Sequence, residues 1–170
     1  MQHTALATDI NAIARLKGSF RLRSGAMADT YFDKYRFESE PALLARVAEA
    51  MVALIPPGTQ VLAGLELGGV PLATAMSLRC GLPAVFVRKA AKEYGTCQAV
   101  EGRDVRGLSA VIIEDVISTG GAVIQSAQLL RDAGATLTGV ICAIWRPAAP
   151  PGLDALEIPV LPVLTAKDLG

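Results

Sequence analysis

An apolar run that ends in two acids and a glycine-rich turn constrains this chain more than any other stretch. Val111-Ile112-Ile113 is β-branched throughout, which predicts a strand buried on both faces of a sheet. Glu114 and Asp115 follow, at the point where such a strand should leave the core. Residues 118–122 are small, and residues 123–130 carry apolar side chains at helical spacing. The stretch therefore predicts a strand, an acid pair, a loop and a helix, in that order.

This order of elements is suited to binding a phosphorylated sugar. The turn offers backbone N–H groups and the helix N-terminus adds its positive dipole end, and both attract a phosphate. Glycine lets the backbone approach the ligand, and the hydroxyls of Ser118 and Thr119 add hydrogen bonds. The two acids would repel a phosphate, but they can accept hydrogen bonds from the hydroxyls of a ribose. The alternative is a buried strand with acids at its exposed end, followed by a capped helix.

A P-loop, the other common phosphate-binding turn, is excluded. The chain contains no GxxxxGK[ST] sequence, and no lysine directly follows Gly121.

The composition predicts one globular domain, residues 1–170, with no nucleic acid or membrane as partner. Hydrophobic residues make up 52% of the chain and charged residues 19%. The formal net charge is zero, which disfavours binding by phosphate neutralisation. The start of the chain lacks the pattern of a signal peptide, and no apolar run is long enough to cross a bilayer. Three widely spaced cysteines fit free thiols in the cytoplasm, and a single histidine excludes His-based metal sites and Ser-His triads.

The rest of the chain alternates between amphipathic segments and short apolar runs. The helical patterns, apart from the one after residue 122, cover residues up to about 17, 39–55 and 68–80. Further buried strands are predicted at residues 61–64, 84–87, 137–145 and 158–164. Residues 20–25 and 29–36 indicate short strands around a turn, and residues 88–106 indicate a long loop. This alternation predicts an α/β fold: an open, mostly parallel sheet flanked by helices, with ligands bound beyond the carboxyl ends of the strands.

Three other segments at that edge of the sheet carry residues suited to a phosphate-rich ligand. The glycines of residues 64–69 can present N–H groups to a pyrophosphate, although a plain strand-to-helix turn explains them equally well. Residues 88–95 are basic and indicate a lid, or else a solvated charged loop. Arg146 is suited to bidentate capture of a substrate carboxylate, or else is a surface arginine. Phe20 and Tyr31 can stack on a heterocycle, or else belong to the core.

The acid pair with Ser118-Thr119-Gly120-Gly121 resembles the signature of the type I phosphoribosyltransferases, which bind phosphoribosyl pyrophosphate (PRPP). Val87-Arg88-Lys89-Ala90-Ala91-Lys92, Gly95 and Arg146 resemble the orotate phosphoribosyltransferases within that family. The resemblance runs from Phe20 to Leu169. It implies the fold described above with a small hood from residues 1–36 and the C-terminal segment. It also implies transfer of a phosphoribosyl group from PRPP to orotate, giving orotidine 5′-monophosphate and pyrophosphate in pyrimidine biosynthesis. The alternatives are transfer to another nucleobase, or a PRPP-sensing regulator without activity.

The same resemblance implies a role for each candidate site residue. The catalytic residues would be Lys92, carried by the lid, and Asp115. PRPP would be bound by Arg88, Lys89, Lys92, Tyr94, Glu114, Asp115, Ser118, Thr119, Gly120, Gly121 and Ala122. The pyrophosphate loop would consist of Glu66, Leu67, Gly68 and Gly69. Orotate would be bound by Ser24, Gly25, Phe32, Ser118 and Arg146.

The resemblance further implies Mg²⁺ and a second copy of the chain. The ion would be carried mainly by PRPP oxygens, with Glu114 and Asp115 as candidate protein ligands. Members of the family are homodimers whose lids reach into the neighbouring site. Three positions depart from the family pattern: Tyr94 stands where the best-known members have a histidine, Gly68 where many have a lysine, and Ala28 where a serine is usual.

Overall fold

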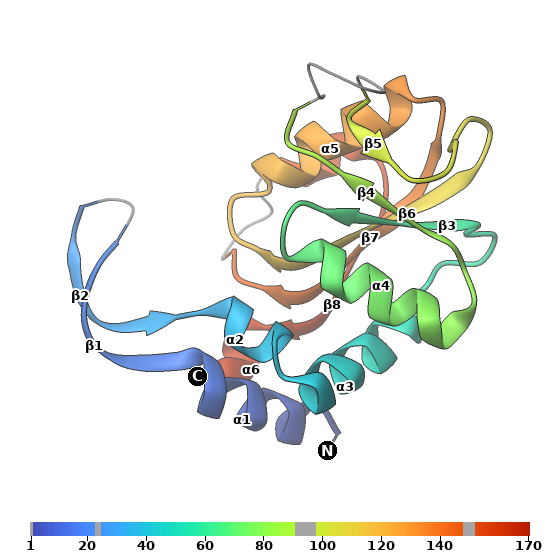
Figure 1. Ribbon diagram of the computed structural model, residues 1–170. Coiled ribbons are helices and arrows are strands. Elements are labelled where there is room, and N and C mark those ends of the chain that lie inside the picture. Colours follow the sequence, from blue (N-terminus) through green and yellow to red (C-terminus); the bar gives the residue numbers. More distant parts are fainter. Residues whose placement is uncertain (1, 23–24, 91–97, 148–151) are drawn as a thin grey trace.

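A six-stranded sheet forms the centre of the computed structural model, which describes residues 2–22, 25–90, 98–147 and 152–170 (Figure 1). The strand order is β5-β4-β3-β6-β7-β8. All neighbouring pairs are parallel except β4 and β5. The strands are β3 (Val61–Leu65), β4 (Ala84–Val87), β5 (Val100–Glu101), β6 (Ser109–Ile117), β7 (Thr136–Trp145) and β8 (Val160–Thr165). The predicted open, mostly parallel sheet is confirmed.

Helices cover both faces of this sheet, so the central strands are buried on both sides (Figure 1). One face packs against α1 (Gln2–Ala14), α3 (Pro41–Val52) and α4 (Gly69–Cys80). The other packs against α5 (Gly121–Asp132) and the short 3₁₀ helix η1 (Leu153–Leu156). Side chains of β6 alternate between the two cores: Val111 and Ile113 join the first, and Ala110 and Ile112 join the second. Within the described residues, no helix is both long and apolar enough to span a membrane.

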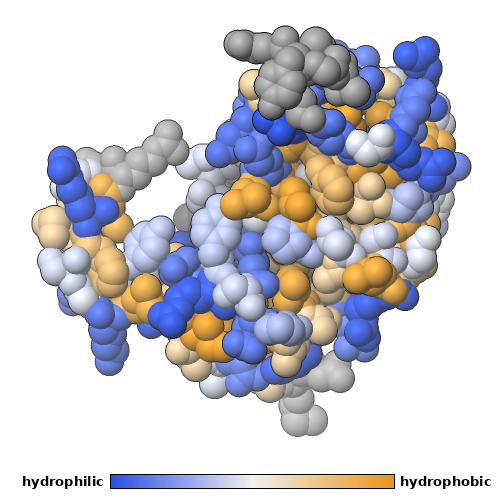
Figure 2. All heavy atoms as spheres, viewed as in Figure 1, coloured by the Kyte–Doolittle hydropathy of each residue, from blue (hydrophilic) through white to orange (hydrophobic). Residues whose placement is uncertain are grey.

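An antiparallel hairpin, β1 (Arg15–Arg21) and β2 (Met27–Phe32), stands out from the body of the molecule (Figures 1 and 2). Two short strands around a turn were predicted, but the first was placed at residues 20–25 and instead begins at Arg15. The expectation that the first helix runs to about residue 17 is also wrong. The helix ends at Ala14 because the following residues pair with β2: Leu16 lies opposite Tyr31 and Lys17 opposite Thr30. At the base of the hairpin, the Asp33 N–H donates to the Ala14 carbonyl at 2.8 Å.

Two short elements were assigned wrongly from the sequence. Residues 33–36 belong to a strand in the sequence interpretation, but β2 ends at Phe32 and α2 (Lys34–Glu38) follows. Asp33 starts this helix, because its carboxylate accepts a hydrogen bond from the Tyr35 N–H at 3.2 Å. Strand β5 lies inside the predicted loop 88–106, where Val100 pairs with Val87 at the edge of the sheet.

The strand order reverses between β3 and β6. Strand β4 lies on one side of β3, whereas β6 and the strands after it lie on the other. In parallel α/β sheets such a reversal leaves a crevice beyond the carboxyl ends of the two strands, and ligands bind there. The segments that leave β3 and β6 at this point are residues 66–68 and 118–120, which the sequence assigns to pyrophosphate and phosphate binding.

Candidate active site

A small hollow at the carboxyl end of β6 joins the acid pair to the predicted phosphate loop. Its volume is about 60 Å³. The residues that line it are Glu114, Val116, Ile117, Ser118, Thr119, Gly120, Ala122 and Val123. The structure therefore brings together one acid of the pair and most of the residues predicted to bind the sugar phosphate.

The first turn of α5 supplies this hollow with backbone donors. Gly120 precedes the helix with a φ of 73°, a left-handed conformation that glycine adopts without strain. It has no side chain to cap the helix, and the N–H of Ile124 bonds back to its carbonyl at 3.0 Å. The N–H groups of residues 121–123 precede that first helical bond, so they are available to an anion.

The acid pair lies deeper than the sequence predicts. Strand β6 continues to Ile117 beside β7, so Glu114 and Asp115 are inside the strand instead of at its exposed end. Glu114 is 7% exposed and Asp115 is 0% exposed. Strand β3 pairs with β6 up to Ile113, and the two acids follow directly after that pairing ends. They therefore face the crevice at the reversal of strand order while remaining shielded from water.

Asp115 is paired with a lysine that sequence reasoning missed. The Lys34 ammonium lies 2.7 Å from Oδ2 of Asp115 and donates a hydrogen bond to Oδ1 at 3.0 Å. Helix α2 carries Lys34 and Glu38 four residues apart, and residues at this spacing share one face of a helix. This i, i+4 pair directly after a helix-starting Asp33 is the sequence signal that was available.

Burial and neighbouring charges shift the pKa values of Glu38, Glu114, Asp115 and Lys34 in different directions. Burial, with the Asp115 charge beside them, raises the pKa of Glu38 to about 9 and that of Glu114 to about 9. Burial also opposes the charged form of Asp115, but hydrogen bonds from Glu114, Glu38 and Lys34 outweigh it and lower the Asp115 pKa. The Lys34 pKa is raised, because its bond to Asp115 outweighs its burial. At neutral pH the cluster therefore holds one carboxylate, one ammonium and two neutral acids.

Gly68 brings the predicted pyrophosphate loop into direct contact with Asp115. A Cβ atom placed on Gly68 would overlap the Asp115 carboxylate. The neighbouring Glu66–Leu67 peptide bond is cis. With Asp115 where it lies, position 68 has no room for the lysine that many family members carry there.

Two hydrogen bonds connect the loops around the crevice. The Lys89 N–H donates to Glu66 Oε2 at 3.2 Å, which joins the segment after β4 to the pyrophosphate loop. The Gln125 side chain donates to the Lys89 carbonyl at 3.0 Å, which joins the same segment to α5. Arg88 and Glu66 line a shared hollow of about 370 Å³. The segment after β4 is thus bonded both to the pyrophosphate loop and to the helix that follows the phosphate loop.

The residues predicted to bind orotate are only partly brought together. The Arg146 guanidinium lies 5.2 Å from the centre of the Phe32 ring, so these two residues form one surface. Gly25 lies in the turn of the hairpin. The hairpin itself projects away from the sheet (Figure 1). Ser24, Lys92 and Tyr94 lie outside the described residues.

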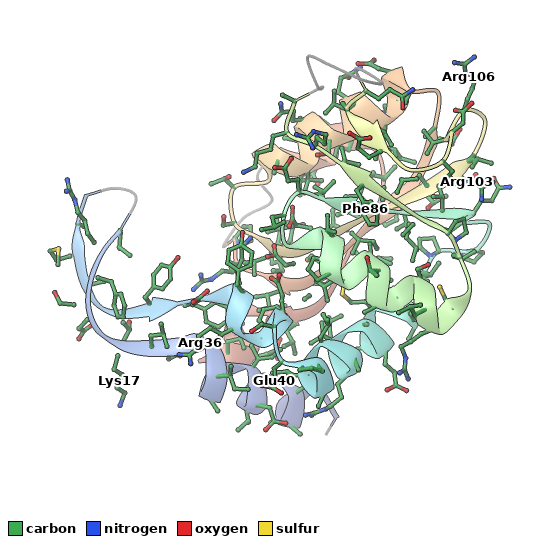
Figure 3. The ribbon with its side chains drawn as sticks, in the orientation of Figure 1. Lys17, Arg36, Glu40, Phe86, Arg103 and Arg106 are labelled. Atoms are coloured by element: carbon green, nitrogen blue, oxygen red, sulfur yellow. The ribbon has the colours of Figure 1, made fainter. Side chains whose placement is uncertain are left out.

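A larger hollow, of about 500 Å³, includes none of the described candidate residues. It is lined in part by Arg103 and Arg106, which precede β6 at its opposite end (Figure 3). Size therefore does not mark the candidate active site; the convergence of the acid pair, the loops and a helix N-terminus does.

The fold and these loops define a phosphoribosyltransferase. A family model described as a phosphoribosyl transferase domain matches residues 36–160. The chain belongs to this family, as its resemblance to the type I enzymes predicts.

Within the family, the similarity is to orotate phosphoribosyltransferases in particular. The orotate phosphoribosyltransferase of Nocardioides sp. is 56% identical over 165 residues, covering 96% of this chain and 92% of that protein. The orotate phosphoribosyltransferase of Mycobacterium tuberculosis H37Rv, solved with Fe(III) dicitrate, superposes with a TM-score of 0.88 at 29% identity, covering 100% and 99% of the two chains. The same enzyme solved with PRPP superposes with a TM-score of 0.83 at 26% identity, with the same coverage.

Proposed function

We propose that this chain transfers the phosphoribosyl group of PRPP to orotate, giving orotidine 5′-monophosphate and pyrophosphate. The observation that carries the proposal is the hollow at the end of β6, where Glu114 meets the phosphate loop and the N-terminus of α5. Orotate as the acceptor rests on the relative from Nocardioides sp., whose name gives that activity. The reaction completes a pyrimidine nucleotide.

The proposed placement of PRPP follows from charge. The 5′-phosphate would bind residues 118–122, where backbone donors and the helix dipole meet. The ribose hydroxyls would donate to Glu114 and Asp115. The pyrophosphate would lie over residues 66–69, within reach of Arg88 and Lys89.

The proposed placement of orotate follows from the contact between Arg146 and Phe32. The guanidinium can pair with the orotate carboxylate, and the ring offers a flat apolar surface to the base. Ser24, Gly25 and Ser118 would complete this pocket. Gly25 would need the hairpin to lie closer to the sheet, or to come from a second copy of the chain.

The chemistry requires positioning and charge stabilisation more than a strong base. The C1′–O bond to pyrophosphate breaks towards an oxocarbenium-like carbon, and both its electrons leave with the pyrophosphate. Lys92 would stabilise the charge that develops on this leaving group, and Asp115 would hold the ribose in place. Orotate is already acidic at its ring nitrogen, so the attacking nitrogen needs no strong general base.

Mg²⁺ belongs to the proposal as a companion of PRPP. This ion is usually held by one or two carboxylates together with substrate phosphates. Among the described residues no three His, Cys, Asp or Glu side chains form a group that could hold a metal. Asp115 would supply one carboxylate, and Glu114 would supply a second only after losing its proton to make room for the ion, which would add positive charge to the pyrophosphate.

The proposal extends to assembly and location. We propose a cytoplasmic homodimer in which each lid reaches into the neighbouring site. The projecting hairpin supports a second copy, because a two-stranded hairpin exposed to water is marginally stable alone. Sedimentation velocity tests the dimer.

We also propose a single domain, with a hood built from residues 1–36 and the C-terminal segment. Hydrogen bonds from Asn11 (2.6 Å) and Arg15 (2.9 Å) to the Leu169 carbonyl in α6 (Ala166–Leu169) support this hood.

The experiment that tests the activity is a panel of bases. The chain is incubated with PRPP, Mg²⁺ and orotate, uracil, adenine, guanine or hypoxanthine, and pyrophosphate release is measured. We expect release with orotate and formation of orotidine 5′-monophosphate. Release with a different base would replace orotate as the acceptor, and PRPP binding without turnover on any base would point to a regulator.

A further inference from the structure

We propose that Lys34 is a PRPP-binding residue whose ammonium group donates to the pyrophosphate oxygens from beside Gly68. This inference deepens the proposed function and rests on it. Lys34 lies in α2, outside every segment that the sequence assigns to the site.

The first argument is position. The Lys34 ammonium is 2.7 Å from Oδ2 of Asp115, and the Asp115 carboxylate is the group that a side chain on Gly68 would overlap. The ammonium is therefore one hydrogen bond away from the floor of the pyrophosphate loop. Position 68 carries no cation, and α2 supplies one to the same carboxylate that Gly68 contacts.

The second argument is charge. PRPP is a polyanion, and in the proposed placement its ribose approaches Asp115, which is buried. Lys34 balances Asp115 before PRPP arrives, so a further negative group can come close without facing an uncompensated acid. An ammonium group has three N–H donors, and one of them bonds Oδ1 of Asp115, while Oδ2 lies in ion-pair distance. The side chain is 33% exposed, so the ammonium can also donate to a ligand.

The third argument is rigidity. Helix α2 is fixed by Phe37, which is fully buried, and Glu38 packs beside Asp115 on the same helix face as Lys34. A lysine held in this way loses less conformational entropy on binding than a free surface lysine.

Calorimetric titration with magnesium pyrophosphate and, separately, with ribose 5-phosphate tests the inference. Lys34→Met removes the charge and keeps the length of the side chain, Lys34→Arg keeps the charge, and Lys167→Met serves as a matched control on the exposed surface of α6. We expect Lys34→Met to weaken pyrophosphate binding roughly tenfold or more while ribose 5-phosphate binding changes by less than about twofold. Lys34→Arg should recover part of the loss, and Lys167→Met should bind both ligands as the unmodified chain does.

A purely structural lysine would give a different pattern. If Lys34 acts only by holding Asp115, ribose 5-phosphate binding falls as much as pyrophosphate binding, and the inference is overturned. It is also overturned if neither ligand is affected.

Because Lys34→Met leaves the Asp115 charge buried and unpaired, the chain can lose stability. The same comparison is therefore made between Asp115→Asn and the double variant with Lys34→Met, where that charge is absent. A Lys34-dependent loss of pyrophosphate binding in this pair supports the inference, and equal binding overturns it. If the unmodified chain binds pyrophosphate through Lys34 but releases none with orotate, the proposed activity fails while the assignment of Lys34 stands.

Discussion

At the scale of single residues, Asp115 connects the parts of the site. Its carboxylate contacts Lys34 from α2 and packs against Gly68 from the pyrophosphate loop. Glu114 beside it lines the hollow at the carboxyl end of β6. Any substitution that moves this carboxylate is therefore expected to disturb ribose and pyrophosphate binding together.

The two neutral acids predict how stability depends on pH. Glu38 and Glu114 have a pKa of about 9 in the folded chain, against ordinary values near 4.5. Between these values the folded chain holds protons that the unfolded chain has lost, so the free energy of unfolding falls as pH rises. The lowered pKa of Asp115 acts below 3.8, and the raised pKa of Lys34 acts above 10.5, so neither sets the slope in this range.

Glu38→Gln keeps a neutral side chain of the same shape and removes one of the two titrating groups. We expect the variant to lose less stability than the unmodified chain between pH 5.5 and pH 8.5. Urea unfolding followed by circular dichroism at several pH values measures this. An unchanged slope would mean that Glu38 is ionised in the folded chain.

Arg146 gives a prediction about substrate preference. Replacing it with alanine removes the guanidinium that faces Phe32 and would pair with the orotate carboxylate. We expect the KM for orotate to rise roughly tenfold or more, while the KM for PRPP changes little. The reverse pattern in steady-state kinetics would place the base pocket elsewhere.

At the scale of elements, α2 is a five-residue helix with a large effect on the site. It is far too short to be stable alone, so its position depends on packing. Phe37 supplies that packing with a fully buried ring, and Lys34 and Glu38 are then carried to Asp115.

Phe37→Ala should therefore destabilise the chain by about 3–5 kcal/mol, the usual cost of removing a buried ring. Arg36→Ala changes the neighbouring, exposed residue of the same helix and should change stability by about 0.5 kcal/mol or less (Figure 3). Chemical unfolding of both variants provides the comparison. Similar effects for the two would mean that α2 is not anchored through Phe37.

The elements also show what the sequence can and cannot predict. Strand β6 and helix α5 were predicted because each has a pattern of apolar residues that is local and extends over enough residues to be recognised. Helix α2 was missed because five residues carry too little periodicity, and its start depends on one side chain, Asp33. The end of α1 was misplaced because pairing with β2 overrides the helical pattern. The Lys34–Asp115 contact joins residues that are 81 positions apart in the sequence, and a local sequence pattern cannot predict a contact over that separation.

At the scale of the whole molecule, ligand binding should be visible as stability. PRPP binds the folded chain and not the unfolded one, so saturation at about 100 times its Kd adds about 2.7 kcal/mol. For a chain of this size we expect the Tm to rise by roughly 5–10 °C in the presence of Mg²⁺. Differential scanning fluorimetry measures the shift, with glucose 6-phosphate at the same concentration as the control. A Tm that PRPP leaves unchanged would contradict the proposed site.

The contact between Gly68 and Asp115 has a consequence for how the chain can vary. Position 68 cannot gain a side chain unless Asp115 first moves, and Asp115 is held in place by Lys34. The three positions should therefore show strong epistasis, in which Gly68→Lys is harmful alone but tolerated once position 34 has changed. Mutational routes between this arrangement and one with a lysine in the loop would then be open in one order and closed in the other.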